Sequence, residues 1–124
     1  MQYCFLHHAA PLAERHLIYP GHLPQKESVS TLKELVINHP LTIQMSMYGG
    51  FEQVGAIGTD LPRDDEEITT EAGDIVLYSG NKISIFYGSN SWAYTRLGKI
   101  TGKTAQVLAD LLGNGDVTIT ITDR

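Results

Sequence analysis

Trp92, Tyr94 and Arg96 are the residues of this chain whose types and spacing best suit ligand binding. They occupy alternate positions of the run SWAYTRLGKI, and alternate side chains of a β-strand point to one face of the sheet. Aromatic faces stack against flat groups, and an arginine binds a carboxylate or phosphate through paired hydrogen bonds. We therefore predict that these three side chains form a ligand-binding surface. The alternative is an ordinary strand face, in which Arg96 lies over an aromatic ring or pairs with an acid.

Tyr48 and Tyr87 are the predicted neighbours of this surface. Both belong to strand patterns, where aromatic residues more often form core contacts or cross-strand pairs than ligand contacts. Phe86 and Tyr87 are adjacent and must face opposite sides of their strand, so only one of them can line a given pocket.

The remaining polar clusters do not match known site patterns. His7, His8, His16 and His22 lie in the first 27 residues, but adjacent histidines cannot easily reach one ion and no Cys or carboxylate falls at a recurrent ligand spacing. The acidic run at 64–67 lacks the alternating oxygen ligands and central glycine of a calcium loop. These patterns predict no metal site, no cofactor and no catalytic residue.

Composition places the chain among single-domain globular proteins. It has 124 residues and a formal net charge of −5, and its nine basic residues are scattered. Nucleic-acid binding and anionic membrane surfaces require clustered Lys and Arg, so neither is an expected partner. The single Cys4 favours a reducing compartment, and no apolar run approaches the roughly 20 residues of a spanning helix. A cytoplasmic location is expected.

The first 27 residues predict an irregular segment, because Pro11, Pro20 and Pro24 disfavour continuous strand or helix. The pattern still allows short extended pieces at Tyr3–Leu6 and Arg15–Tyr19. We therefore divide the chain into residues 1–27 and a domain over residues 28–124.

The rest of the chain alternates between strand and helix patterns. Helices are predicted at about Ser28–Asn38 and Thr104–Leu112, from apolar residues at helical spacing. The acidic stretch Thr59–Glu71 predicts a solvated loop, and Asp74 is expected to be a turn carboxylate. Strands are predicted at Leu41–Tyr48, Phe51–Ile57, Ile75–Tyr78, Lys82–Tyr87, Trp92–Ile100 and Val117–Thr122, with a hairpin turn at Gly80-Asn81. The predicted inward positions are Ile43, Met45, Ile75, Leu77, Ile83, Ile85, Val117, Ile119 and Ile121.

The runs LTIQMSMYGGFEQVG, GTDLP, TTEAGDIVLYSGN, ISIFYGSNSWAYTRLGKI and GDVTITI, taken in this order, resemble the uncharacterised bacterial cyclophilin-like domain family. The resemblance implies a mainly β fold, a cyclophilin-like antiparallel β-barrel with two helices closing its ends. As the family is known, its members have no established reaction, and some occur beside or fused to flavodoxin-type domains. The resemblance thus implies a barrel that binds a small molecule or a peptide without established catalysis.

Two alternatives remain open at this point: a weak peptidyl-prolyl isomerase, or an accessory to a flavodoxin-type redox partner. The isomerase requires an apolar proline pocket and an arginine aimed at the substrate amide. The Phe-His-Arg run and the Gln-Gly-Gly-Asp turn of true cyclophilins are absent, and Arg96 is the only arginine on a matched strand. An enzyme is therefore not expected.

Family members usually begin with a β-hairpin, and residues 1–27 do not predict one. A barrel that lacks a hairpin exposes strand edges, whose unpaired backbone groups recruit another strand. We therefore expect a homodimer, formed by edge pairing or by exchange of the N-terminal segment. The alternative is a monomer in which the short N-terminal pieces pair within the chain.

Overall fold

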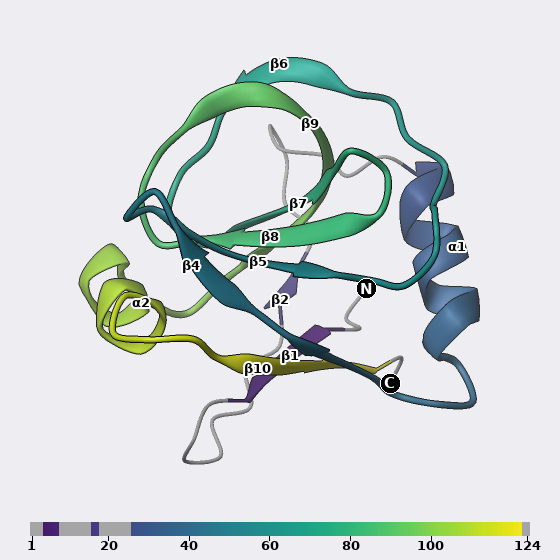
Figure 1. Cartoon of the computed structure of the whole chain (residues 1–124), viewed down its shortest axis with the longest axis horizontal. Coiled ribbons are helices and arrows are strands. Elements are labelled where there is room, and N and C mark those ends of the chain that lie inside the picture. Colours follow the sequence, from purple (N-terminus) through teal and green to yellow (C-terminus); the bar gives the residue numbers. More distant parts are fainter. Residues whose placement is uncertain (1–3, 8–15, 18–25, 123–124) are drawn as a thin grey trace.

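The computed structural model describes residues 4–7, 16–17 and 26–122, and in this part the protein is mainly β (Figure 1). Its two helices occur where the sequence predicts them, one before and one after the main run of strands. The helices are α1 (Lys26–Val36) and α2 (Ala105–Leu112), and the strands are β1 (Cys4–His7), β2 (His16–Leu17), β3 (Leu41–Gln44), β4 (Ser46–Tyr48), β5 (Glu52–Ala56), β6 (Glu66–Thr69), β7 (Asp74–Tyr78), β8 (Lys82–Phe86), β9 (Ser91–Ile100) and β10 (Thr118–Ile121).

The strands form two antiparallel sheets. The smaller has the order β1-β10-β3 and the larger has the order β2-β9-β7-β8-β5-β4, with β6 paired to β9. Met45 alone separates β3 from β4, and its backbone N–H donates to the carbonyl of Val117 at 2.8 Å. The two sheets are therefore joined through one nearly continuous strand, while β9 curves over β7 and β8 (Figure 1).

The sequence predicts a closed barrel, and the described strands do not close into one. The pairing ends at β1 on one side and at β2 on the other, and in the described residues no strand pairing joins these two edges. The mainly antiparallel β fold with two helices is confirmed, whereas a closed barrel is not seen.

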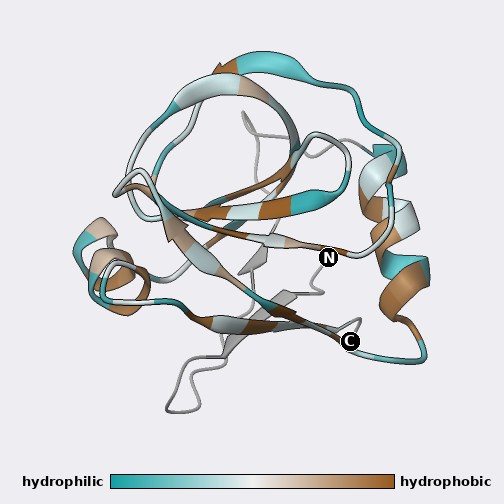
Figure 2. Cartoon of the chain, in the orientation of Figure 1, coloured by the Kyte–Doolittle hydropathy of each residue, from teal (hydrophilic) through white to brown (hydrophobic). Residues whose placement is uncertain are grey.

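The main core lies between the two sheets and beneath both helices. All nine predicted inward positions are buried, so the alternation in the sequence identified this face correctly. Figure 2 shows hydrophobic bands on the strands and on both helices. Helix α1 contributes Val29, Leu32 and Val36, and α2 contributes Leu108 and Leu112. Burial of this apolar surface is the main force that holds the helices against the sheets.

Helix α2 is fixed at both ends. At its start the Thr104 hydroxyl accepts from the backbone N–H of Val107, as an N-cap does. At its end the Gln53 side-chain amide donates to the carbonyls of Leu112 and Gly115, both at 2.7 Å. Because Gln53 lies on β5, these bonds tie the end of α2 directly to the larger sheet.

The short extended pieces predicted in the N-terminal segment are confirmed. Strand β1 pairs with β10, where Cys4 lies opposite Ile121, and β2 pairs with β9, where His16 lies opposite Ile100. The prolines on which the irregular segment was predicted lie outside the described residues.

Two local predictions were wrong. The stretch Thr59–Glu71 is not only a solvated loop, because β6 forms within it and pairs with β9 from Glu66↔Tyr94 to Thr69↔Ser91. Backbone pairing does not require apolar side chains, so the exposed Glu66 and Glu67 concealed this strand. The β7–β8 hairpin forms as predicted, but its positive φ values fall at Ser79 and Gly80 rather than at Gly80 and Asn81.

Candidate functional site

The outer face of the larger sheet carries a second, smaller core. Val76, Phe86 and Tyr94 are buried there, and the rings of Phe86 and Tyr94 lie 5.5 Å apart in an edge-on arrangement. Phe51 stacks on Phe86 with ring centroids 6.2 Å apart, and Tyr78 contacts Tyr94 edge-on at 6.1 Å. Strands β7, β8 and β9, with Phe51 just before β5, therefore present a continuous aromatic floor away from the main core.

Above this floor lies a cavity of about 480 Å³, within the size range of small-molecule sites. We call it the aromatic cavity. It is lined by Tyr48, Phe51, Glu52, Val54, Tyr78, Lys82, Asn90, Trp92 and Tyr94.

Three of the five predicted site residues line this cavity together. Tyr94 is buried in its wall with 3% exposure, whereas Trp92 is 55% exposed and Tyr48 is 65% exposed at its rim. Tyr48 comes from β4 and Trp92 from β9, so residues distant in the sequence converge on one opening. Large aromatic side chains left this exposed are typical of a binding surface.

Tyr87 and Arg96 lie elsewhere. Tyr87 packs against the main core on the opposite face from Phe86, as adjacent strand residues must. Its hydroxyl is buried and finds no hydrogen-bond partner among the residues that the structure describes. Arg96 is half-buried on the part of β9 that pairs with β7, outside the cavity lining. The first half of β9 pairs with β6. The second half pairs with β7, with a register shift at Ile75/Val76. The pairing partner of β9 therefore changes between Tyr94 and Arg96, and Arg96 lies on the part that pairs with β7.

Glu52 is the functional candidate that the sequence analysis missed. Its side chain lines the cavity although the residue is only 5% exposed, and its Oε1 accepts from the Ser84 hydroxyl at 3.1 Å. Burial raises the pKa of this carboxyl above its ordinary value, and the Ser84 hydrogen bond opposes part of that rise. Glu52 shares a strand face with Val54 and Ala56, but this spacing does not by itself show that the acid is buried.

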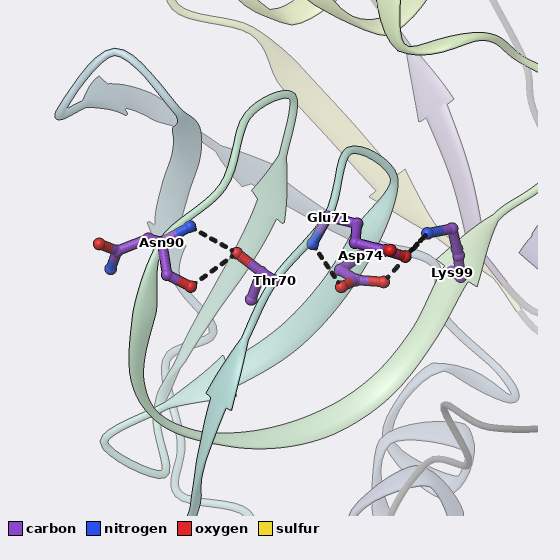
Figure 3. Close-up of polar contacts among 5 residues, drawn as sticks. All are labelled: Thr70, Glu71, Asp74, Asn90 and Lys99. Atoms are coloured by element: carbon purple, nitrogen blue, oxygen red, sulfur yellow. Dashed lines mark hydrogen bonds and ion pairs between the residues drawn. The ribbon is translucent and has the colours of Figure 1, made fainter.

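Tyr94 is held by a chain of hydrogen bonds that begins outside the cavity. The Asn90 side-chain amide donates to the Tyr94 hydroxyl at 2.8 Å. The backbone of Asn90 is in turn fixed by Thr70, whose hydroxyl accepts from the Asn90 N–H and donates to the Asn90 carbonyl, both at 3.0 Å (Figure 3). Burial raises the pKa of Tyr94, with the charge of Glu52 a smaller cause in the same direction. The phenol therefore stays protonated and can donate a hydrogen bond into the cavity.

Asp74 lies farther along the same segment and has a structural role. Its Oδ2 accepts from the Glu71 N–H at 2.8 Å, which is the turn contact that the sequence predicted (Figure 3). Lys99 lies opposite Asp74 in the register and bridges the two acids, with its Nζ 3.2 Å from Glu71 Oε2 and 3.5 Å from Asp74 Oδ1. This cluster fixes the start of β7 and does not line the aromatic cavity.

Lys82 adds a positive charge to one end of the cavity. It lies opposite Ala56 on β5 and opposite Tyr78 across the hairpin, and its Nζ donates to Asn81 Oδ1 at 3.3 Å. In the described part of the chain no ion pair joins Lys82 to Glu52. The cavity thus combines aromatic walls with an acid and a base that do not neutralise each other directly.

These features describe a small antiparallel β protein with a recessed aromatic cavity on the outer face of its larger sheet. The model of the Cyclophilin-like family matches residues 18–122, and the chain belongs to this family. No curated protein and no solved structure matched the chain in the corresponding comparisons. Among the described residues, neither helix has the length and apolar character needed to cross a bilayer.

Proposed function

We propose that the protein binds a small molecule or a peptide in the aromatic cavity and catalyses no reaction there. The observation that carries the proposal is the convergence of Tyr48, Trp92 and Tyr94 on one cavity, with Trp92 left 55% exposed at its opening. Aromatic walls supply apolar contact area, while Glu52 and the Tyr94 hydroxyl supply polar groups that fix orientation.

Trp92 makes this proposal directly testable, because it is the only tryptophan of the chain and its emission reports on the cavity. A fragment library is screened by Trp92 fluorescence, and each hit is mapped by amide chemical shifts. We expect the shifts to gather around the cavity, and Trp92→Leu to weaken binding by about tenfold, as loss of an aromatic anchor does. Tyr87→Phe is the matched control, because Tyr87 lies outside the lining. The affinity of this variant for each hit should be unchanged. A tight ligand that binds elsewhere and leaves Trp92 emission unchanged would contradict the proposal.

Prolyl isomerase activity is not expected, and Arg96, the arginine that could polarise a substrate amide, lies outside the cavity lining. A protease-coupled assay on a proline tetrapeptide should show only the background rate. Acceleration that disappears in Arg96→Ala would instead favour the weak isomerase. An accessory role to a flavodoxin-type partner would be supported by a yellow colour of the purified protein.

A closed barrel, a homodimer and a cytoplasmic location remain predictions. The N-terminal strands pair within the chain, which is the arrangement considered above for a monomer. Light scattering at micromolar concentration tests the assembly, and a single mass near 13.7 kDa would reject the homodimer.

A further inference from the structure

We infer that the aromatic cavity selects an organic cation, an amine or guanidinium group held by the Glu52 carboxylate among the surrounding aromatic rings. This inference rests on the proposed function, because it names the class of ligand that the same cavity takes. It replaces the flat or anionic group that the sequence suggested from Arg96, which lies outside the lining.

The first argument is the incomplete pairing of Glu52. The residue is 5% exposed and lines the cavity, and in the described part of the chain Ser84 is its one hydrogen-bond donor. It forms no ion pair with any described Lys, Arg or His. Buried carboxylates are normally paired, because the low-dielectric interior disfavours a lone charge. A ligand cation that enters the cavity would supply the missing partner.

The second argument is the surrounding rings. Tyr48, Tyr78, Trp92 and Tyr94 all line the cavity with Glu52, and Tyr48 lies directly opposite Glu52 in the β4–β5 register. Ring faces attract ammonium and guanidinium groups, and the attraction increases when the site is desolvated. An anionic ligand would meet the same ring faces and the Glu52 charge unfavourably.

The third argument concerns Lys82, the other charged side chain in the lining. Glu52 and Ala56 are the two ends of β5, and Lys82 lies opposite Ala56, so about 13 Å of strand separates the two positions. The Lys82 ammonium donates to Asn81 beside the hairpin turn. Lys82 therefore leaves the Glu52 end of the cavity available to a cation. Its own positive charge repels a cation from the other end.

The test compares two probes that share a benzyl group and differ in the head group, the cation benzylammonium and the neutral benzyl alcohol. Both are titrated at about pH 7.5, where the amine is protonated, and binding is followed by Trp92 emission and amide chemical shifts. We expect benzylammonium to bind about tenfold more tightly than benzyl alcohol. Glu52→Gln keeps the shape and removes the charge, so it should abolish this preference while the alcohol still binds.

Glu67→Gln is the matched control, since Glu67 is an exposed acid on β6 and its removal should leave the preference intact. A second readout is the Glu52 carboxyl carbon, followed by NMR: bound benzylammonium should lower the pKa of this carboxyl, and benzyl alcohol should not. The other ionisable groups that line the cavity are followed in the same titration, namely Tyr48, Tyr78, Lys82 and Tyr94.

The outcomes separate this inference from the proposed function. Equal binding of the two probes to the wild-type protein overturns the cation preference and leaves the cavity as a binding site. A preference that survives in Glu52→Gln also overturns it, because another group must then recognise the charge. If fragment screening finds ligands but none in this cavity, both statements are overturned together.

Discussion

Replacement of Glu52 by glutamine should stabilise the protein, and the gain should depend on pH. Glu52 is 5% exposed and, within the described ranges, its carboxyl accepts one hydrogen bond, from Ser84, so burial raises its pKa above the ordinary value of 4.5. In the unfolded chain the group titrates near that ordinary value. Between the unfolded and the folded pKa the native state therefore holds more protons than the unfolded state.

The sign of the effect follows from this difference. The wild-type free energy of unfolding is highest below the unfolded pKa and falls as pH rises through the folded pKa. Glutamine keeps the bond to Ser84 and has no charge to desolvate. The free energy of unfolding of Glu52→Gln should therefore not fall over this pH range. Each unit of pKa elevation is worth about 1.4 kcal/mol. We therefore expect the variant to match the wild type at about pH 4 and to exceed it at about pH 8, by up to the roughly 1–3 kcal/mol that desolvation of an incompletely paired polar group costs.

Urea unfolding followed by Trp92 emission at several pH values measures this difference. Glu67→Gln, which removes an exposed acid on β6, serves as the control and should give a nearly constant offset. A stability difference for Glu52→Gln that is independent of pH, or that shrinks as pH rises, would refute the reasoning. Either result would mean that a nearby group already balances the buried charge.

Three further substitutions test the packing described above by urea unfolding. Gly55→Ala should cost about 1–3 kcal/mol, because a Cβ there would lie 2.8 Å from the backbone oxygen of Gln44; an unchanged midpoint would contradict this close approach. Gln53→Leu removes two 2.7 Å hydrogen bonds at the end of α2, so it should cost about 2 kcal/mol and speed amide exchange in the last turn of that helix. Phe86→Ala empties a fully buried position below the cavity and should cost about 3–5 kcal/mol, and a smaller loss would show that the aromatic floor collapses to fill the space.

The main core could be predicted from the sequence because it depends on a local pattern. Ile119 and Ile121 alternate with Thr118 and Thr120 on β10, and this alternation marks the buried face of that strand. On β7 Ile75 and Leu77 lie opposite Ile85 and Ile83 of β8, which alternate with Lys82 and Ser84. Strand β6 could not be found in this way. Its residues bond to β9 through the backbone, and only Ile68 packs on the second core, so no alternation of apolar residues marks it.

The site was only half predictable for a related reason. Trp92 and Tyr94 share a face of β9 as the period of two requires, and they reach the cavity together with Tyr48. Arg96 follows the same period, but β9 changes its pairing partner between these positions and curves, which sequence spacing does not reveal. Glu52 was missed because an acid in a strand is normally exposed, and only the tertiary arrangement shows that it is covered.

The pairing of β1 with β10 determines when this protein can finish folding. The register from Cys4↔Ile121 to His7↔Thr118 joins segments from opposite ends of the chain. During synthesis β1 emerges well before β10, so this edge stays unpaired until β10 has also left the ribosome. Contacts of such long sequence separation also slow folding, because a large loop must close before they form. Nascent chains should therefore depend on chaperones more than a helical protein of equal length does, and truncation within β10 should give aggregation-prone products rather than a smaller folded domain.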